Sequence, residues 1–161
     1  MVSGSVYINR GQLGLGELTE EALSLGQDRL LLLDRWKGAP GKIELYTLTP
    51  TVRRWFPIIY LHSVAAQREF GKATRARTAV TNTVIEGSNS DVHRLAEAVG
   101  GFLEIPKVKS ETAEIDGICM SFGNAQGHTA MVTFKRLPEQ AEIGPRLVVR
   151  HLAWSEKGEG S

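Results

Sequence analysis

The sequence predicts an α/β or α+β fold in which two lobes of mixed β-sheet carry packed helices. Three observations lead to this prediction. Stretches of helical periodicity alternate with short apolar runs, glycine and proline separate them, and the order helix, strand, strand occurs twice. The chain has 161 residues, of which 42% are hydrophobic and 23% charged. These values are typical of a folded domain and exclude a disordered or fibrous chain.

The first unit of helix, strand and strand is predicted near the N-terminus. Apolar residues at i, i+3, i+7 and i+10 predict a helix over 15–25, and Gly26 supplies a left-handed stop. The uninterrupted apolar run at 30–33 predicts a strand that is buried on both faces. Glycine and proline at 36–41 predict a turn, and residues 43–48 alternate as a second strand.

The second unit follows the same order. Ser90 is the predicted N-cap of an amphipathic helix, and the glycine pair at 100–101 is its predicted end. Apolar segments at 118–122 and 129–134 flank a glycine-bracketed turn, which predicts a β-hairpin. We therefore infer a weak internal duplication.

The duplication divides the chain into halves at about 6–48 and 90–137. Further strands are expected at 58–62, 78–85 and 147–154. Prolines are expected at the edges of the elements, namely Pro50, Pro57, Pro106, Pro138 and Pro145. We expect one domain over residues 1–154, with a first lobe at about 1–57, a second at about 58–154, and a flexible tail at 155–161.

The composition bears on the cellular compartment. No apolar run reaches the roughly 18 residues that span a bilayer, and the N-terminus lacks the pattern of a signal peptide. The single cysteine, Cys119, forms no internal disulfide and suits a reducing cytoplasm. A cytoplasmic protein without a membrane association is therefore expected.

Motifs for catalysis or cofactor binding are missing from the sequence. The four histidines, at 62, 93, 128 and 151, lack the spacing of metal ligands, and no GxSxG elbow is present. The glycines at 11, 14 and 16 match neither the dinucleotide fingerprint nor the P-loop. We expect no enzyme activity, cofactor, metal or small-molecule substrate. An enzyme that uses scattered carboxylates such as Glu44 or Asp116 is the least favoured alternative.

Charge is concentrated in the middle of the chain. The whole sequence has a net charge of +1, but residues 34–77 contain nine basic and three acidic residues, a net charge of +6. Cations interleaved with aromatic rings favour RNA, because cations hold phosphates and rings stack on unpaired bases. The expected RNA contacts in this segment are Arg35, Trp36, Lys37, Lys42, Arg53, Arg54, Trp55, Arg68, Lys72, Arg75 and Arg77. Either of the two tryptophans has the alternative of packing beneath its loop.

Several short segments resemble one known family, the archaeal Brix-domain proteins. The segments are 9–12 (NRGQ), 17–29, 36–43 (WKGAPGKI) with Tyr46, 64–71 (VAAQREFG) and 143–147 (IGPRL). Their order and spacing cover roughly residues 10–150. The resemblance implies a two-lobed fold similar to the anticodon-binding domains of class II aminoacyl-tRNA synthetases. It also implies a function, because the family's members bind ribosomal RNA precursors and assist ribosome assembly without catalysing a reaction.

The resemblance adds candidate RNA contacts at Arg10 and Arg146 and supports those at 35–42 and Arg68. Arg10 and Arg146 have an alternative role, because each lies beside a turn and is placed to bond backbone carbonyls. The sequence starts after the position of the strand and helix that open the family's domain. Either the N-terminus is truncated or misassigned, or this member lacks these elements, in which case we expect an exposed sheet edge that invites pairing with another chain.

Two functions remain open from the sequence. The leading hypothesis is a non-enzymatic factor that binds precursor ribosomal RNA and assists its processing and ribosome assembly, alongside other assembly proteins. The alternative is a protein-interaction scaffold without direct RNA contact. Such a scaffold would present the sheet edge or the acidic segment at 86–116 to an assembly partner.

Overall fold

The computed structural model describes residues 6–36, 39–65, 80–108 and 117–156. The elements in these ranges, in chain order, are α1 (Leu15–Ser24), β1 (Arg29–Trp36), β2 (Ala39–Thr47), β3 (Arg53–Ala65), β4 (Val80–Val84), α2 (Ser90–Leu103), β5 (Gly117–Ala125), β6 (His128–Leu137), β7 (Ala141–Glu142) and β8 (Arg146–Ala153). The predicted mixed α/β class is confirmed. The predicted tail falls mostly on residues 157–161, outside the described residues.

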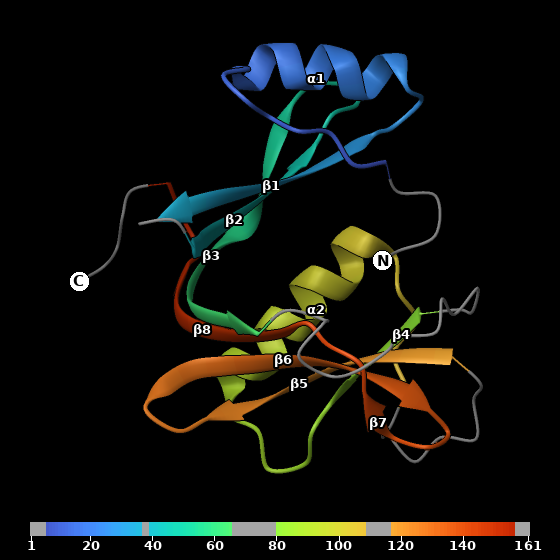
Figure 1. The fold of residues 1–161 in the computed structure, drawn as a ribbon, viewed down its shortest axis with the longest axis vertical. Coiled ribbons are helices and arrows are strands. Elements are labelled where there is room, and N and C mark those ends of the chain that lie inside the picture. Colours follow the sequence, from blue (N-terminus) through green and yellow to red (C-terminus); the bar gives the residue numbers. More distant parts are fainter. Residues whose placement is uncertain (1–5, 37–38, 66–79, 109–116, 157–161) are drawn as a thin grey trace.

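All the strands in these ranges belong to one mixed sheet (Figure 1). Its order is β1-β2-β3-β8-β6-β5-β4, and β7 pairs with β6. Only β4 and β5 run parallel among the described pairs. A helix precedes an antiparallel pair in each half, β1 with β2 and β5 with β6, as the inferred duplication requires. Strand β3 runs through residue 57, where the lobe boundary is predicted, so the sheet continues from one half to the other.

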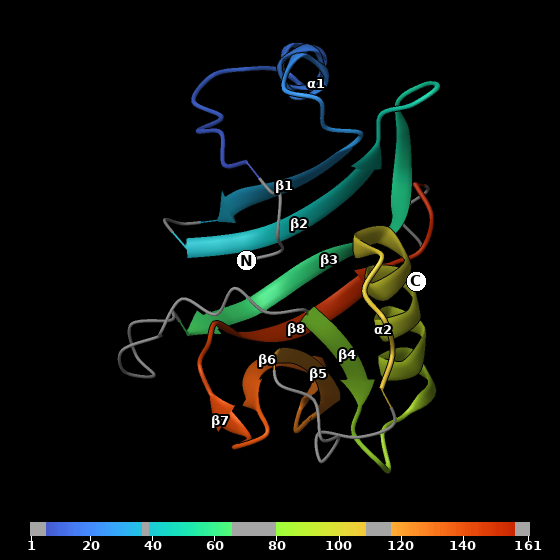
Figure 2. The ribbon, with the colours of Figure 1, turned by 90° about the vertical axis from the view of Figure 1, so that its right-hand side faces the viewer.

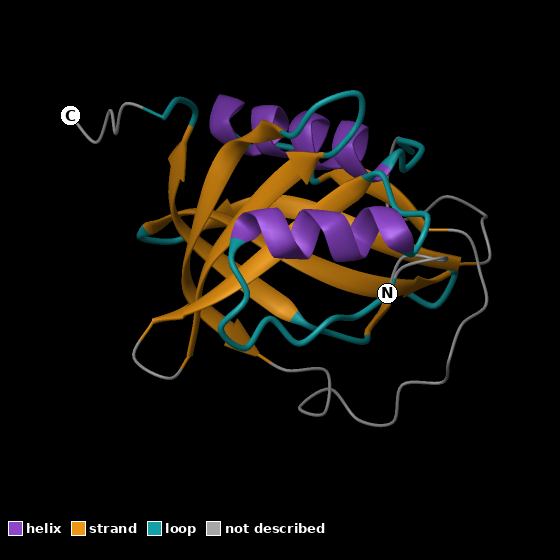
Figure 3. Ribbon diagram, turned by 90° about the horizontal axis from the view of Figure 1, so that it is seen from above, coloured by secondary structure: helices purple, strands orange, loops and turns teal. Residues whose placement is uncertain are grey.

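The two helices pack on opposite faces of the sheet. Leu18 and Ala22 of α1 share a small core with Leu32, Tyr46 and Leu48. The alternate residues of β2, Ile43 and Leu45, instead belong to the main core under α2. Because successive side chains of a strand point to opposite faces, α1 and α2 lie on different sides. Figure 2 shows α1 above β1 and β2 and α2 beside β3 and β4, and in Figure 3 strands pass between the helices.

The main core holds most of the buried apolar side chains. Val92 and Leu95 of α2 and Phe122 of β5 are almost completely buried in it. Each such side chain stabilises the fold by about 1.5–3 kcal/mol relative to exposure. The small core of α1 has five buried residues, so α2 anchors more of the sheet than α1 does.

The prediction that residues 30–33 are buried on both faces is wrong. Leu32 is buried against α1, but Leu31 and Leu33 are 50% and 52% exposed. The reason is that β1 lies at one edge of the described sheet, and α2 packs on β3, β4, β5 and β6, which are farther along it. Within the described ranges, β1 therefore has a helix on one face only.

Strand β3 begins earlier than predicted and contains Pro57, which was expected at an element edge. The ladder with β2 is irregular at this point, because Ile43 pairs with Ile59 and Leu45 with Trp55. Pro57 lies in the bulge between these pairs and interrupts no regular pairing there, since a bulge accommodates the missing N–H.

The ends of α2 also differ from the prediction. The N-cap is Asn89, not Ser90, and its side chain accepts a hydrogen bond from the Val92 N–H at 3.0 Å. The helix continues through the glycine pair to Leu103. A Cβ on Gly100 would lie 2.2 Å from Nδ2 of Asn82, so this glycine serves close packing against β4 rather than helix termination.

The remaining strand predictions are confirmed within one to three residues at most ends. Strand β2 begins four residues before the predicted 43–48, and β5, β6 and β8 contain or overlap their predicted segments. The hairpin turn is tighter than expected, since Ala125 pairs with His128 and Gly127 has φ of 75°. Residues 78–79 of the predicted 78–85 strand lie outside the described residues.

The cap assignment gives a direct test on stability. Asn89→Ala is expected to lower the free energy of unfolding by about 1 kcal/mol, because it leaves a helix N–H without its acceptor. Ser90→Ala, at the exposed first helical position, is the matched control and is expected to change stability by less than about 0.5 kcal/mol. Urea unfolding measures both, and a larger loss for Ser90→Ala would contradict the assignment.

Candidate nucleic-acid interface

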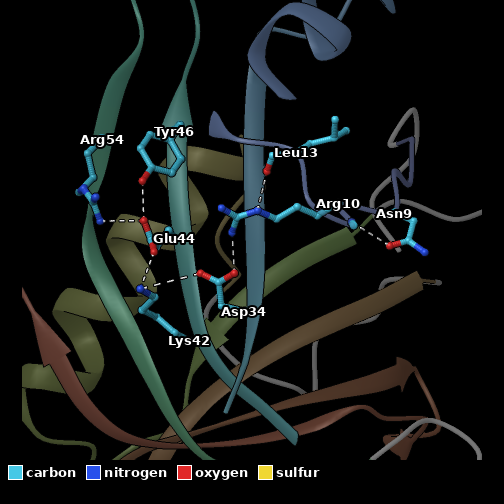
Figure 4. Close-up of polar contacts among 9 residues, drawn as sticks. Asn9, Arg10, Leu13, Asp34, Lys42, Glu44, Tyr46 and Arg54 are labelled. Atoms are coloured by element: carbon cyan, nitrogen blue, oxygen red, sulfur yellow. Dashed lines mark hydrogen bonds and ion pairs between the residues drawn. The ribbon is translucent and has the colours of Figure 1, made fainter. Parts of the chain in front are cut away.

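Three of the predicted RNA-binding cations lie in one ionic network on the α1 face of the sheet (Figure 4). Nη1 of Arg10 lies 2.7 Å from Oδ1 of Asp34. Nζ of Lys42 lies 2.8 Å from Oε1 of Glu44, and Nη1 of Arg54 lies 3.0 Å from Oε2 of the same carboxylate. Much of their positive charge is therefore neutralised within the protein.

Glu44 is the centre of this network. Glu44 is 8% exposed, and its carboxylate also accepts a hydrogen bond from the Tyr46 hydroxyl. Burial alone would raise the pKa of Glu44, but the hydrogen bonds from Lys42 and Tyr46 and the charges of Lys42 and Arg54 lower it. Burial, followed by the bond to Glu44, raises the pKa of Tyr46 to about 12. The carboxylate is thus held ionised as an ion-pair partner, which is poorly suited to general acid–base work at neutral pH.

Arg10 makes a carbonyl contact of the kind its alternative role predicts, whereas Arg146 bonds a carboxylate. Arg146 forms a bidentate pair with Glu142, with Nε–Oε1 and Nη2–Oε2 distances of 2.8 and 2.6 Å. This hydrogen bond raises the pKa of the Arg146 guanidinium. Arg10 donates from Nε to the Leu13 carbonyl at 3.1 Å in addition to pairing with Asp34.

Trp55 fastens α2 to β3. Its Nε1–H donates to the Ala98 carbonyl at 2.9 Å, and its ring centroid lies 6.0 Å from that of Phe102. Trp55 is 36% exposed, but these two contacts hold its indole against α2, as the packing alternative requires. The predicted contacts whose side chains lie outside the described residues are Trp36, Lys37, Arg68, Lys72, Arg75 and Arg77.

Two of the predicted cations, Arg35 and Arg53, are exposed and pair with no carboxylate in the described ranges. They lie far apart on the sheet. Arg53 begins β3, at the end of the strand near α1, whereas Arg35 lies near the opposite end of β2. The structure therefore does not join them in one surface.

Arg35 lines a cleft of about 260 Å³ on the sheet surface. The lining residues are Asp34, Arg35, Gly41, Lys42, Tyr60 and Arg150. The Arg150 guanidinium carbon lies 5.2 Å from the centre of the Tyr60 ring, and the ring of His151 lies 5.7 Å from it. The cleft thus joins an aromatic ring to three cations.

Two strand irregularities form this cleft. Tyr60 pairs with His151 and Leu61 pairs with Val149, which leaves Arg150 as an extra residue in β8. Gly41 is likewise unpaired, because Asp34 pairs with Lys42 and Arg35 with Pro40. Such bulges redirect side chains, and the one in β8 brings Arg150 as well as His151 to the Tyr60 ring. Helix α1 packs on Leu32, Tyr46 and Leu48, away from the cleft.

Tyr60, Arg150 and His151 were not predicted as site residues from the sequence. The alternation at 58–62 contains a signal for Tyr60, since Ile59 and Leu61 point into the core and Tyr60 therefore points away. The bulge that positions Arg150 has no comparable signal in the sequence.

Two of the four histidines lie against each other. The rings of His62 and His128 stack with centroids 4.1 Å apart. Within the described ranges, no group of three or more histidine, cysteine, aspartate or glutamate side chains is arranged to hold a metal ion.

No helix in the described ranges has the length and apolar character needed to cross a membrane.

Comparison with known proteins identifies archaeal relatives. A probable Brix domain-containing ribosomal biogenesis protein of Pyrococcus horikoshii is 37% identical over 71 residues. That of Thermococcus kodakarensis is 36% identical over 67 residues. The chain is a homologue of these Brix-domain proteins. The predicted resemblance is confirmed, although the matches cover 44% and 42% of the chain and only 32% of each relative, and no protein-family profile matches the chain.

Solved structures share the fold over almost the whole chain. A probable ribosomal biogenesis protein from Aeropyrum pernix K1 superposes with a TM-score of 0.73 at 19% identity, covering 97% of this chain and 84% of that one. Mil, an archaeal Imp4-like protein, has a TM-score of 0.62 at 16% identity, covering 96% and 85%. At these identities the likeness establishes the fold.

The Glu44 network predicts a pH-dependent effect on stability. Glu44→Gln is expected to lower the free energy of unfolding at pH 7 by about 1–3 kcal/mol, because it leaves Lys42 and Arg54 without their carboxylate. A lowered carboxyl pKa contributes stability above the ordinary value of 4.5, and this stability is lost as pH falls through the folded-state pKa. The difference from wild type should therefore shrink toward pH 3 in urea unfolding.

Glu104→Gln is the control for that measurement. Glu104 pairs with Arg29 at 2.5 Å, but its side chain is 72% exposed, so solvent screens the pair. A much smaller effect is expected at pH 7. Equal losses in the two variants, or a loss at Glu44 that persists unchanged at pH 3, would contradict the role given to the network.

Proposed function

We propose that this chain is a non-enzymatic ribosome-biogenesis factor that binds precursor ribosomal RNA in the cytoplasm and assists its processing and assembly. Its curated relatives are named as probable ribosomal biogenesis proteins. The observation that carries RNA binding is the cleft at Tyr60, where exposed Arg35 and Arg150 adjoin an aromatic ring.

The ion pairs indicate which cations of this surface are available to RNA. Arg10, Arg54 and Arg146 are engaged with carboxylates, and a phosphate would have to compete with those pairs. Arg35 and Arg150 have no such competitor in the described ranges. Guanidinium groups bind phosphates well, and unpaired bases stack on aromatic rings. We therefore assign the principal RNA contacts to the cleft.

The proposal is tested with the full chain and fragments of its own precursor ribosomal RNA at several salt concentrations, with bulk tRNA as competitor. If four to six phosphates of single-stranded RNA are neutralised, log K should fall with log salt at a slope of about −3 to −4. No binding at low salt, a slope near zero, or complete displacement by tRNA would refute a specific RNA role.

Single substitutions then locate the interface. Arg35→Ala and Arg150→Ala are each expected to weaken binding and to reduce the magnitude of the salt slope by about 0.7, because each removes one phosphate contact. Arg53→Ala removes the same charge from an exposed site on β3, roughly 23 Å along the strand from Tyr60 at about 3.3 Å per residue. Equal weakening in all three variants would mean that RNA follows overall charge rather than the cleft.

The protein-interaction scaffold remains the second candidate, because one observation favours it. Among the described strands, β1 lies at one edge of the sheet and exposes Leu31 and Leu33. An exposed edge strand pairs readily with another chain. Stable co-purification with one protein partner, at an absorbance ratio typical of protein without nucleic acid, would favour the scaffold over the RNA-binding factor.

A further inference from the structure

We propose that the cleft at Tyr60 binds one unpaired guanine nucleotide of an RNA strand. The inference rests on the proposed function and specifies which part of the RNA enters the cleft. It follows from the size of the cleft and from the different chemistry of its walls.

The size of the cleft fits a single nucleotide. Its volume is about 260 Å³, below the roughly 300–1,000 Å³ of pockets for drug-sized ligands. Gly41 lines the cleft and contributes no side chain to it. A base with its sugar therefore enters more readily than a larger cofactor.

Tyr60 provides the stacking surface. Its neighbours on either side are Lys42 of β2, with which it pairs, and His151 of β8. The His151 ring is inclined by 32° to it, and the Arg150 guanidinium lies over it at 5.2 Å. These contacts orient the ring in advance, so less side-chain freedom is lost when a base stacks on it.

Asp34 provides an unusual acceptor in a basic cleft. Its Oδ1 accepts from Arg10 at 2.7 Å, whereas Oδ2 is 3.8 Å from Nζ of Lys42, beyond hydrogen-bond distance. Glu44, by contrast, has three donors on its two oxygens. Asp34 is one-third exposed and therefore retains the capacity to accept a bond from a ligand.

The carboxylate selects among the bases. Guanine presents two adjacent N–H donors, N1–H and N2–H, on its pairing edge. Adenine and cytosine present one amino group beside a ring nitrogen that accepts, and the N3–H of uracil lies between two carbonyl oxygens. Acceptors facing a carboxylate repel it, so guanine fits Asp34 best. This edge is free only in an unpaired base, which specifies a single-stranded segment.

The opposite charges of Asp34 and of the two arginines determine how the nucleotide is oriented in the cleft. The carboxylate of Asp34 repels phosphate, while Arg35 and Arg150 attract it. The base edge therefore points to Asp34 and the phosphate to the arginines. An inorganic anion would satisfy only one side of this arrangement.

The test measures binding of the full chain to fluorescent uridine octamers that carry one central guanosine, adenosine or cytidine, and to the all-uridine octamer. The guanosine octamer is expected to bind about tenfold more tightly than the all-uridine octamer, since bonds to a charged acceptor are among the stronger ones. Inosine, which lacks the N2 amino group, should lose part of this preference.

Three variants separate the contributions. Asp34→Asn keeps a carbonyl for Arg10 and is expected to abolish the guanosine preference. Asp28→Asn makes the same charge change at an exposed position before β1 and should retain the preference. Tyr60→Ala should weaken binding of every octamer, and Tyr60→Phe should retain it. Circular dichroism checks that each variant folds.

The outcomes distinguish this inference from the proposed function. Precursor RNA that binds specifically, while the octamers show no guanosine preference or Asp34→Asn retains it, would overturn the guanine site and leave the proposed function standing. Absence of precursor binding would overturn both. Tighter binding of GTP than of the guanosine octamer would overturn the assignment to RNA in favour of a free nucleotide.

Discussion

The antiparallel ladder between β3 and β8 is the constraint on which the rest of the structure depends. Within the described sheet, it joins β1 and β2 to the strands that follow α2. Its two-residue periodicity assigns Ile59 and Leu61 to the main core and Tyr60 to the opposite face. Its bulge then places Arg150 beside Tyr60. The same pairing therefore holds the halves together and builds the candidate site.

Position on the sheet, rather than the number of cations, decides which of them are available to a ligand. Lys42 and Arg54 flank the buried Glu44, so their charge offsets the cost of burying that carboxylate. Arg35 and Arg150 lie farther from it, at the cleft. A segment that is strongly basic in sequence thus presents a much smaller set of unpaired cations on the folded surface.

Local patterns in the sequence were sufficient for most elements, and contacts between distant elements explain the failures. The helical spacing at 15–25 and the stop at Gly26 correspond closely to α1. The glycine pair at 100–101 was misinterpreted because Gly100 accommodates Asn82, a residue on another element. The exposure of Leu31 and Leu33 depends on where α2 packs, which no local pattern contains.

Only some of the ion pairs at the site could be predicted from the sequence. Lys42, Glu44 and Tyr46 are spaced by two residues on one strand, so their common face follows from alternation. The approach of Arg54 to Glu44 requires the β2–β3 register, and that of Arg150 to Tyr60 requires the β8 bulge. The register between strands that are far apart in the sequence therefore limited the prediction of the site more than the prediction of the fold.

The unequal size of the two cores has a consequence for motion. Helix α1 rests on a cluster of five buried residues, separate from the main core under α2. Regions with few buried contacts open at lower free energy than the whole domain, so we expect α1 to open while the main core stays folded. Arg10 precedes this helix and bonds Asp34. Opening of α1 would therefore release a cation from the carboxylate that lines the cleft, which couples local unfolding at one end of the sheet to the charge of the candidate site.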